Sequence, residues 1–155
     1  MGIPAELETR KMSSAMDAPN NLVLERAMGA VCGGAAGDAL GAGYEFTNPH
    51  PEDEIVMKGG GAFNWAPGEW TDDTAMAVAI IDVLAKGHCD IEEIGENFLS
   101  WYASSPPDVG IQTSAVLSSA KNGAELIHEG QEFYDQNPHK AGNGALMRTG
   151  PVALS

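Results

Sequence analysis

Apolar residues recur at helical spacing in several separate stretches of this chain. The first stretch runs from Leu22 through Leu24, Ala27, Met28, Val31 and Ala35 among many small residues, which predicts a core helix in close contact with a neighbour. Further helices are expected over residues 71–87, 90–102, 110–122, 124–134 and 144–155, with Gly123 as a stop signal. Because the alternation typical of strands is scarce, we predict an all-α fold, a helical bundle.

Irregular segments separate these helices. Residues 48–70 form a long link rich in Pro and Gly, and loops of that length are usually functional or disordered. Residues 1–20 show no periodicity and are expected to be a flexible arm, which leaves residues 21–155 as the domain portion. The last stretch reaches Ser155 inside an apolar run without a cap, so we expect the helical bundle to be truncated there.

The composition of the chain limits its size class, its possible partners and its expected location. The chain has 155 residues, 43% of them hydrophobic, which suffices for one globular core. Its formal net charge of −14 argues against nucleic acid or an anionic membrane as a partner, because both are bound through surplus Lys and Arg. Cys32 and Cys89 have neither zinc spacing nor a disulfide framework, so a cytoplasmic location is expected. Neither a membrane-spanning run nor a secretion signal is evident.

The most informative motif is Thr71-Asp72-Asp73-Thr74, directly before an almost entirely apolar helical stretch. One interpretation is structural, because Thr and Asp are common in helix caps and first turns. A single cap needs only one side-chain oxygen, however, and two surplus carboxylates at the edge of a core are costly without a partner. The alternative is a metal site, since hydroxyl and carboxylate oxygens are the ligands that Mg²⁺ and Mn²⁺ prefer.

Four segments, in this order and spacing, resemble the ADP-ribosylglycohydrolase family. They are GGAAGDALGAGYEF at 33–46, EWTDDTAM at 69–76, PDVGIQT at 107–113 and GNGALMR at 142–148. The resemblance covers roughly residues 24–155. It implies an all-α fold, a site with two Mg²⁺ or Mn²⁺ ions, and cleavage of ADP-ribose from a modified protein side chain or a small ADP-ribose conjugate.

The resemblance also implies roles for individual residues. Thr71, Asp72 and Asp73 would be metal ligands. Glu45, on a mobile loop, and Asp108 would be the catalytic acids beside the scissile ribose. Gly110, Asn143 and Gly144 would bind the substrate, with backbone N–H groups near the pyrophosphate.

One part of the family pattern is missing from this sequence. The family takes its remaining metal ligands from a second acidic segment far toward the carboxyl terminus, so a missing C-terminal half is expected. Three ligands cannot fill two octahedral coordination shells. Two other hypotheses therefore stay open: a truncated, non-catalytic ADP-ribose-binding or regulatory module, and an inert fragment.

Three other groups of polar residues are expected to be structural. Asp38, in a Gly-rich bend, is expected to make a local turn hydrogen bond rather than to support the site. Arg148 is expected in a structural ion pair. The four histidines have no metal spacing and are expected at the surface: His50, His88, His128 and His139.

Overall fold

The structure is a computed structural model that describes the backbone of residues 5–155 and the side chains from residue 21 on. Helix α1, Ala5–Gly41, crosses between two compact units that divide after Gly33, and the candidate site lies in the unit from Gly34 to Ser155. The flexible arm expected over residues 1–20 stays a prediction, since its first four residues and all its side chains lie outside the described part.

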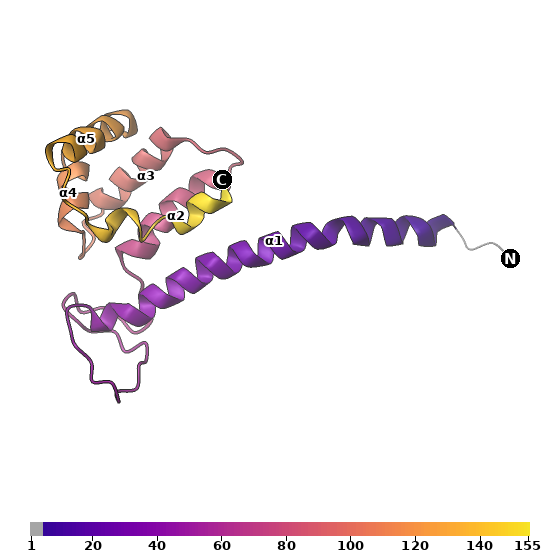
Figure 1. Cartoon of the computed structure of the whole chain (residues 1–155), viewed down its shortest axis with the longest axis horizontal. Helices are drawn as coiled ribbons and strands as arrows, with labels where there is room; N and C mark the ends of the chain where they lie inside the picture. Colours follow the sequence, from indigo (N-terminus) through magenta and orange to yellow (C-terminus); the bar gives the residue numbers. More distant parts are fainter. Residues whose placement is uncertain (1–4) are drawn as a thin grey trace. The chain divides into compact units, whose positions relative to one another are not determined.

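The second unit is built from short helices (Figure 1). In chain order after α1 they are η1 (Ala42–Tyr44), α2 (Asp72–Leu84), α3 (Ile91–Ala103), α4 (Ile111–Leu117), α5 (Gly123–Gln136), η2 (Asn143–Ala145) and η3 (Gly150–Leu154). Within residues 5–155 there is no β-strand, and one isolated bridge joins Gly60 to Trp65. The predicted all-α fold is confirmed.

Two helix starts follow the expected chemistry, and one predicted boundary is wrong. The Asp90 carboxylate accepts hydrogen bonds from the backbone N–H groups of Glu92 and Glu93 and so caps α3. Asn122 caps α5 by accepting from the N–H of Glu125. Gly123 therefore opens a helix instead of stopping one, and α4 already ends at Leu117.

The core lies between α2, α3, α4 and α5, which Figure 1 shows gathered together. Its buried apolar side chains come from all four helices: Met76, Ala79, Ile80, Phe98, Leu117 and Leu126. Polar side chains link the same helices, because Asn97 Nδ2 donates to the Ala79 carbonyl at 2.9 Å and Tyr102 Oη lies 2.9 Å from Ser114 Oγ. The apolar face of α2 is thus fixed in the core, which places its first turn at the core edge.

Close backbone approach is found at glycines other than those expected. A Cβ on Gly34 or Gly37 of α1 would meet nothing within 4 Å, so the predicted close contact is absent there. A Cβ on Gly123 would lie 2.0 Å from the Glu92 carbonyl oxygen. A Cβ on Gly43 would lie 2.2 Å from the Gly59 carbonyl oxygen. Glycine at position 43 therefore lets the backbone of residue 59, in the link after η1, pass close to η1.

The last two elements differ from the single helix expected from residue 144. The chain forms two 3₁₀ helices, η2 and η3, separated by a turn. Proline at position 151 has no N–H to donate and fits only the first turn of a helix, which favours a new start there. No helix within the described residues is long and apolar enough to cross a membrane.

Candidate active site

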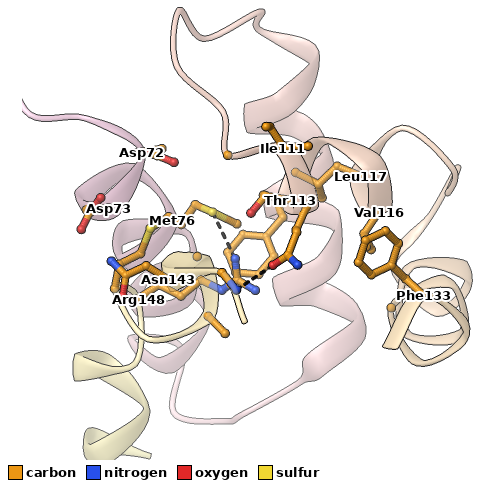
Figure 2. Close-up of a pocket in the computed structure, with 18 of the residues that line it drawn as sticks. Asp72, Asp73, Met76, Ile111, Thr113, Val116, Leu117, Phe133, Asn143 and Arg148 are labelled. Carbon is orange, nitrogen blue, oxygen red and sulfur yellow. Dashed lines mark hydrogen bonds between the residues drawn. The ribbon is translucent and has the colours of Figure 1, made fainter. Parts of the chain in front are cut away.

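A cavity of about 970 Å³ opens at the first turn of α2 and extends along α3, α4 and α5 (Figure 2). Seven of the eight residues predicted to form the site line it: Glu45, Asp72, Asp73, Asp108, Gly110, Asn143 and Gly144. They come from four separate places in the chain, and the fold brings these places together around one cavity. Thr71, the eighth, does not line the cavity and is buried beside it, with 7% of its surface exposed.

Asp38 holds the first turn of α2 in place. Its carboxylate accepts hydrogen bonds from the N–H and the hydroxyl of Thr71, at 2.9 and 2.7 Å, and from the N–H and the hydroxyl of Thr74, at 3.1 and 2.6 Å. Asp38 therefore caps α2 from 33 residues away, and the expected local turn hydrogen bond is wrong. Asp38 instead supports the start of the helix that carries the acid pair, which is the role not expected from the sequence.

This arrangement bears on the two interpretations of the acid motif. Thr71 occupies the N-cap position of α2, but its side chain makes no capping hydrogen bond. Because Asp38 supplies the cap, neither Asp72 nor Asp73 is needed for it. Both carboxylates stay half-buried at the cavity wall, where Figure 2 shows them on the same turn of α2.

The electrostatics of the acid pair are those of carboxylates without a cation. Burial, followed by the charges of Asp108 and Asp73, raises the pKa of Asp72 to about 6. Burial, followed by the charge of Asp38, raises the pKa of Asp73. A divalent cation between them would oppose both shifts, since an opposite charge favours the ionised form.

Glu45 and Asp108 form a second acidic pair in the cavity wall. Burial, followed by the charges of Asp108 and Asp72, raises the pKa of Glu45 to about 7. Burial raises the pKa of Asp108, and a hydrogen bond from Glu45 opposes that rise. The two carboxyls therefore shift one another's pKa in opposite directions, because a protonated Glu45 can donate to an ionised Asp108. Such a pair can release and take up a proton near neutral pH, as general acid–base chemistry requires.

The Glu45 segment is anchored by hydrogen bonds at the residue before it. Tyr44, the residue before it, donates its hydroxyl to the Val56 carbonyl at 3.1 Å and accepts from the Val56 N–H at 3.0 Å. This pair closes the loop between residues 44 and 56. Phe46, the residue after it, is left-handed at φ 58° and 79% exposed, a conformation that a bulky residue rarely adopts.

Arg148 lies in the cavity wall. Among residues 21–155 no carboxylate oxygen lies within 4.0 Å of its guanidinium, so the expected structural ion pair is wrong. The guanidinium instead donates to Met76 Sδ at 3.3 Å and lies over the Phe98 ring, 4.9 Å from its centre (Figure 2). Burial lowers the pKa of Arg148, and the charge of Asp72 opposes that shift.

The histidines lie at the surface as predicted. All four are exposed. One group of three metal-ligating side chains within the described residues has ligand atoms within 4.8 Å of one another: His128, Glu129 and Glu132. It lies on a single face of α5, outside the cavity, where neighbouring charges at helical spacing are commonplace.

Three residues that matter to the site were not predicted as part of it. Asp38 and Arg148 were assigned other structural roles, and Gln112 was not singled out. Gln112 Oε1 accepts from the Gly142 N–H at 2.9 Å, beside Asn143. No local pattern distinguishes these residues, because their partners lie 30 or more residues away.

Comparisons with known proteins agree with the resemblance seen in the sequence. The family model described as ADP-ribosylglycohydrolase matches residues 19–155. An ADP-ribosylarginine hydrolase Tri1 from Serratia proteamaculans is 34% identical over 88% of this chain and 38% of its own length. An ADP-ribosyl-[dinitrogen reductase] glycohydrolase from Rhodospirillum rubrum is 39% identical over 86% of this chain and 45% of its own length.

The fold is matched as well. A solved structure titled ADP-ribosylglycohydrolase-related protein complex superposes with a TM-score of 0.63 at 34% identity, over 83% of this chain and 42% of that one. The chain thus spans less than half the length of the relatives that it matches here. Since the family model covers nearly all of the domain portion, the chain belongs to the ADP-ribosylglycohydrolase family.

Proposed function

We propose that the protein carrying this chain is a metal-dependent hydrolase that releases ADP-ribose from a modified protein side chain or a related small conjugate. The observation that carries the proposal is the convergence of four acids, Glu45, Asp72, Asp73 and Asp108, on one cavity in a member of this family. The names of the relatives from Serratia and Rhodospirillum support ADP-ribosylated protein as the substrate class.

The residues at the first turn of α2 fit a hard divalent cation, Mg²⁺ or Mn²⁺. Among residues 21–155, no Lys, Arg or His nitrogen lies within 4.0 Å of the carboxylate oxygens that Asp72 and Asp73 offer. The Thr71 hydroxyl gives its proton to Asp38, so its lone pairs are left to accept. Together the three residues would hold one ion, with water completing the shell, and two ions would need ligands from elsewhere in the protein. A bound divalent cation would polarise ribose hydroxyls and lower the pKa of a bound water.

The second acidic pair would handle the proton. Hydrolysis of a glycosidic bond needs a water that loses a proton on one side and a leaving group that gains one on the other. The pKa of Glu45 is raised to about 7 by burial and by the charges of Asp108 and Asp72, so Glu45 can exchange a proton near neutral pH. Either Glu45 or Asp108, in its carboxylate form, would deprotonate the attacking water. The carboxylate form would also face the positive charge that develops on the ribose ring.

The glycine-containing segments would hold the ADP-ribose. Gly110, Asn143 and Gly144 line the same cavity as the α2 acids, and glycine lets a ligand approach the backbone closely. Figure 2 shows Asn143 beside Arg148 and Met76. A strongly acidic chain offers few cations to a pyrophosphate, so backbone N–H groups are suited to that contact. Two unpaired, exposed cysteines favour a reducing compartment such as the cytoplasm.

An assay of ADP-ribose release tests the proposal. The native full-length protein is incubated with Mg²⁺ or Mn²⁺ and with ADP-ribosylated arginine, ADP-ribosylated serine or O-acetyl-ADP-ribose. We expect turnover of at least one substrate, its loss with a chelator, and a decrease of about a hundredfold or more in Asp108→Asn. Asp82→Asn is the matched control, because Asp82 is exposed on α2, away from the cavity. Absence of turnover with every substrate contradicts the proposal, and ADP-ribose binding without turnover would favour the non-catalytic module.

A further inference from the structure

Gln112 connects two parts of the cavity wall that are distant in the sequence. Its side-chain Oε1, in the first turn of α4, accepts a hydrogen bond of 2.9 Å from the backbone N–H of Gly142. Gly142 is the residue before η2, which begins at Asn143. Figure 2 marks this hydrogen bond with a dashed line beneath Thr113. It joins the α4 turn that follows Asp108 and Gly110 to the segment 142–144.

Close contacts on both sides of Asn143 fit the segment to α4. A Cβ on Gly142 would lie 2.2 Å from Gln112 Oε1, well inside the shortest contact that real Cβ atoms make. A Cβ on Gly144 would lie 2.7 Å from Thr113 Oγ1. Two consecutive side chains of α4 therefore occupy the space in front of two glycines, with Asn143 between them.

The backbone of Gly142 does not itself require glycine. Its φ and ψ of −76° and 153° lie in the extended region, which any residue adopts. A side chain at this position would therefore be opposed only by Gln112, whose amide would have to move away and give up its hydrogen bond to residue 142. The remaining hydrogen bonds of the segment are local, from the N–H groups of Leu146 and Met147 to the Asn143 carbonyl. Gln112 is thus the side chain that ties the start of the segment to α4.

We propose that Gln112 is a positioning residue, which holds Asn143 and Gly144 at a fixed place relative to Asp108 so that ADP-ribose meets a preformed wall. This inference rests on the proposed function, because it assigns the bound molecule to this cavity. Gln112 itself needs no contact with the substrate. Loss of its hydrogen bond lets the segment move, so binding weakens while the acids that carry out the reaction stay in place.

A double-mutant cycle tests the proposal on the native full-length protein. Gln112→Ala removes the acceptor of the Gly142 hydrogen bond, and one exposed hydrogen bond changes affinity by a few-fold. We therefore expect the Kd for ADP-ribose and the KM to rise about threefold to tenfold, while kcat stays within about twofold of the wild-type value. Gly142→Ala places a methyl group against Oε1 and should weaken binding at least as much. In the double variant the methyl group no longer meets Oε1, so its effect should be no larger than that of Gly142→Ala alone.

A second readout does not depend on catalysis. In Gln112→Ala the amide hydrogen of Gly142 should exchange with solvent at least severalfold faster, measured by NMR, while the affinity for Mn²⁺ is unchanged. Gly150→Ala is the matched control, because a Cβ there meets nothing within 4 Å, and it should alter neither quantity.

The outcomes separate this inference from the proposed function. An active wild-type protein with unchanged ADP-ribose affinity and unchanged Gly142 exchange in Gln112→Ala overturns the role of Gln112 alone. Additive effects in the double variant overturn it too. A wild-type protein that turns over no substrate contradicts the proposed function, whereas the exchange rate and the ADP-ribose affinity still decide whether Gln112 positions the segment.

Discussion

Removal of the Asp38 carboxylate should destabilise the protein more than removal of any exposed acid. Asp38→Ala deletes the acceptor of four hydrogen bonds and leaves the hydroxyls of Thr71 and Thr74 without it, each residue being only 7% exposed. A buried polar group left unpaired costs about 1–3 kcal/mol. Because the four bonds share one carboxylate, their contributions do not simply add, and we expect a loss of about 3–5 kcal/mol in the free energy of unfolding.

The variant Asp38→Asn removes the negative charge of Asp38 but keeps an oxygen that can cap α2. An amide oxygen in the place of Oδ2 can still accept three of the bonds, but the amide NH₂ then faces the Thr71 hydroxyl. That hydroxyl must turn and accept, which uses the lone pair proposed for the metal. We expect a smaller loss of stability, about 1–2 kcal/mol, together with weaker Mn²⁺ binding.

Urea and thermal denaturation followed by circular dichroism measure both effects. A loss of 3–5 kcal/mol corresponds to a decrease of roughly 6–20 °C in Tm for a chain of this size. Asp82→Ala, an exposed position on α2, is the control and should change stability by less than about 0.5 kcal/mol. Equal stability of Asp38→Ala and Asp82→Ala would refute the assignment of Asp38 as the cap of α2.

Three further predictions concern acidity, helix packing and metal binding. Glu45 has a pKa of about 7 in the fold against an ordinary value of 4.5, so between these pH values the native state binds more protons than the unfolded chain. The free energy of unfolding of the metal-free protein, measured by urea denaturation, should therefore fall as pH rises from 4.5 to 7. The decrease should be smaller in Glu45→Gln. Gly123→Ala places a Cβ 2.0 Å from a backbone oxygen and should cost about 3 kcal/mol, whereas Gly130→Ala, with 3.9 Å to its nearest neighbour, should be tolerated; a tolerated Gly123→Ala would contradict the α3–α5 contact. Saturating Mn²⁺ should raise the wild-type stability by about 2.7 kcal/mol at a hundred times Kd, and Asp72→Asn should abolish this gain in a thermal-shift measurement; an equal gain in the variant would exclude Asp72 as a ligand.

Local signals predicted the helices well where caps and apolar spacing agree. The helix after Asp90 begins and ends within a residue of the expected bounds, since its capping residue and its apolar face both lie within one continuous segment of sequence. Gly123 was misread because glycine occurs at both ends of helices, and its use here depends on Glu92 of a neighbouring helix. In place of the single helix expected from residue 144, the chain forms two 3₁₀ helices, and Pro151 lies in the first turn of the second.

The acids of the site could be predicted from the sequence, but the residues that support them could not. Asp72 and Asp73 are neighbours, so their surplus charge is visible in the motif itself. Asp38 and Gln112 act on partners 33 and 30 residues away, and only the fold brings those partners within hydrogen-bond distance. Arg148 lies over the Phe98 ring rather than beside an acid, and this position depends on how the residues of the cavity wall pack.

The metal site at the first turn of α2 is the claim on which the proposed chemistry depends most directly. Anomalous diffraction from crystals of the native protein soaked in Mn²⁺ tests it without reference to any substrate. We predict a peak within coordination distance, about 2.0–2.3 Å, of oxygen atoms from Thr71, Asp72 and Asp73. A strong peak at His128 and Glu132 on α5, with none at the cavity, would contradict this account.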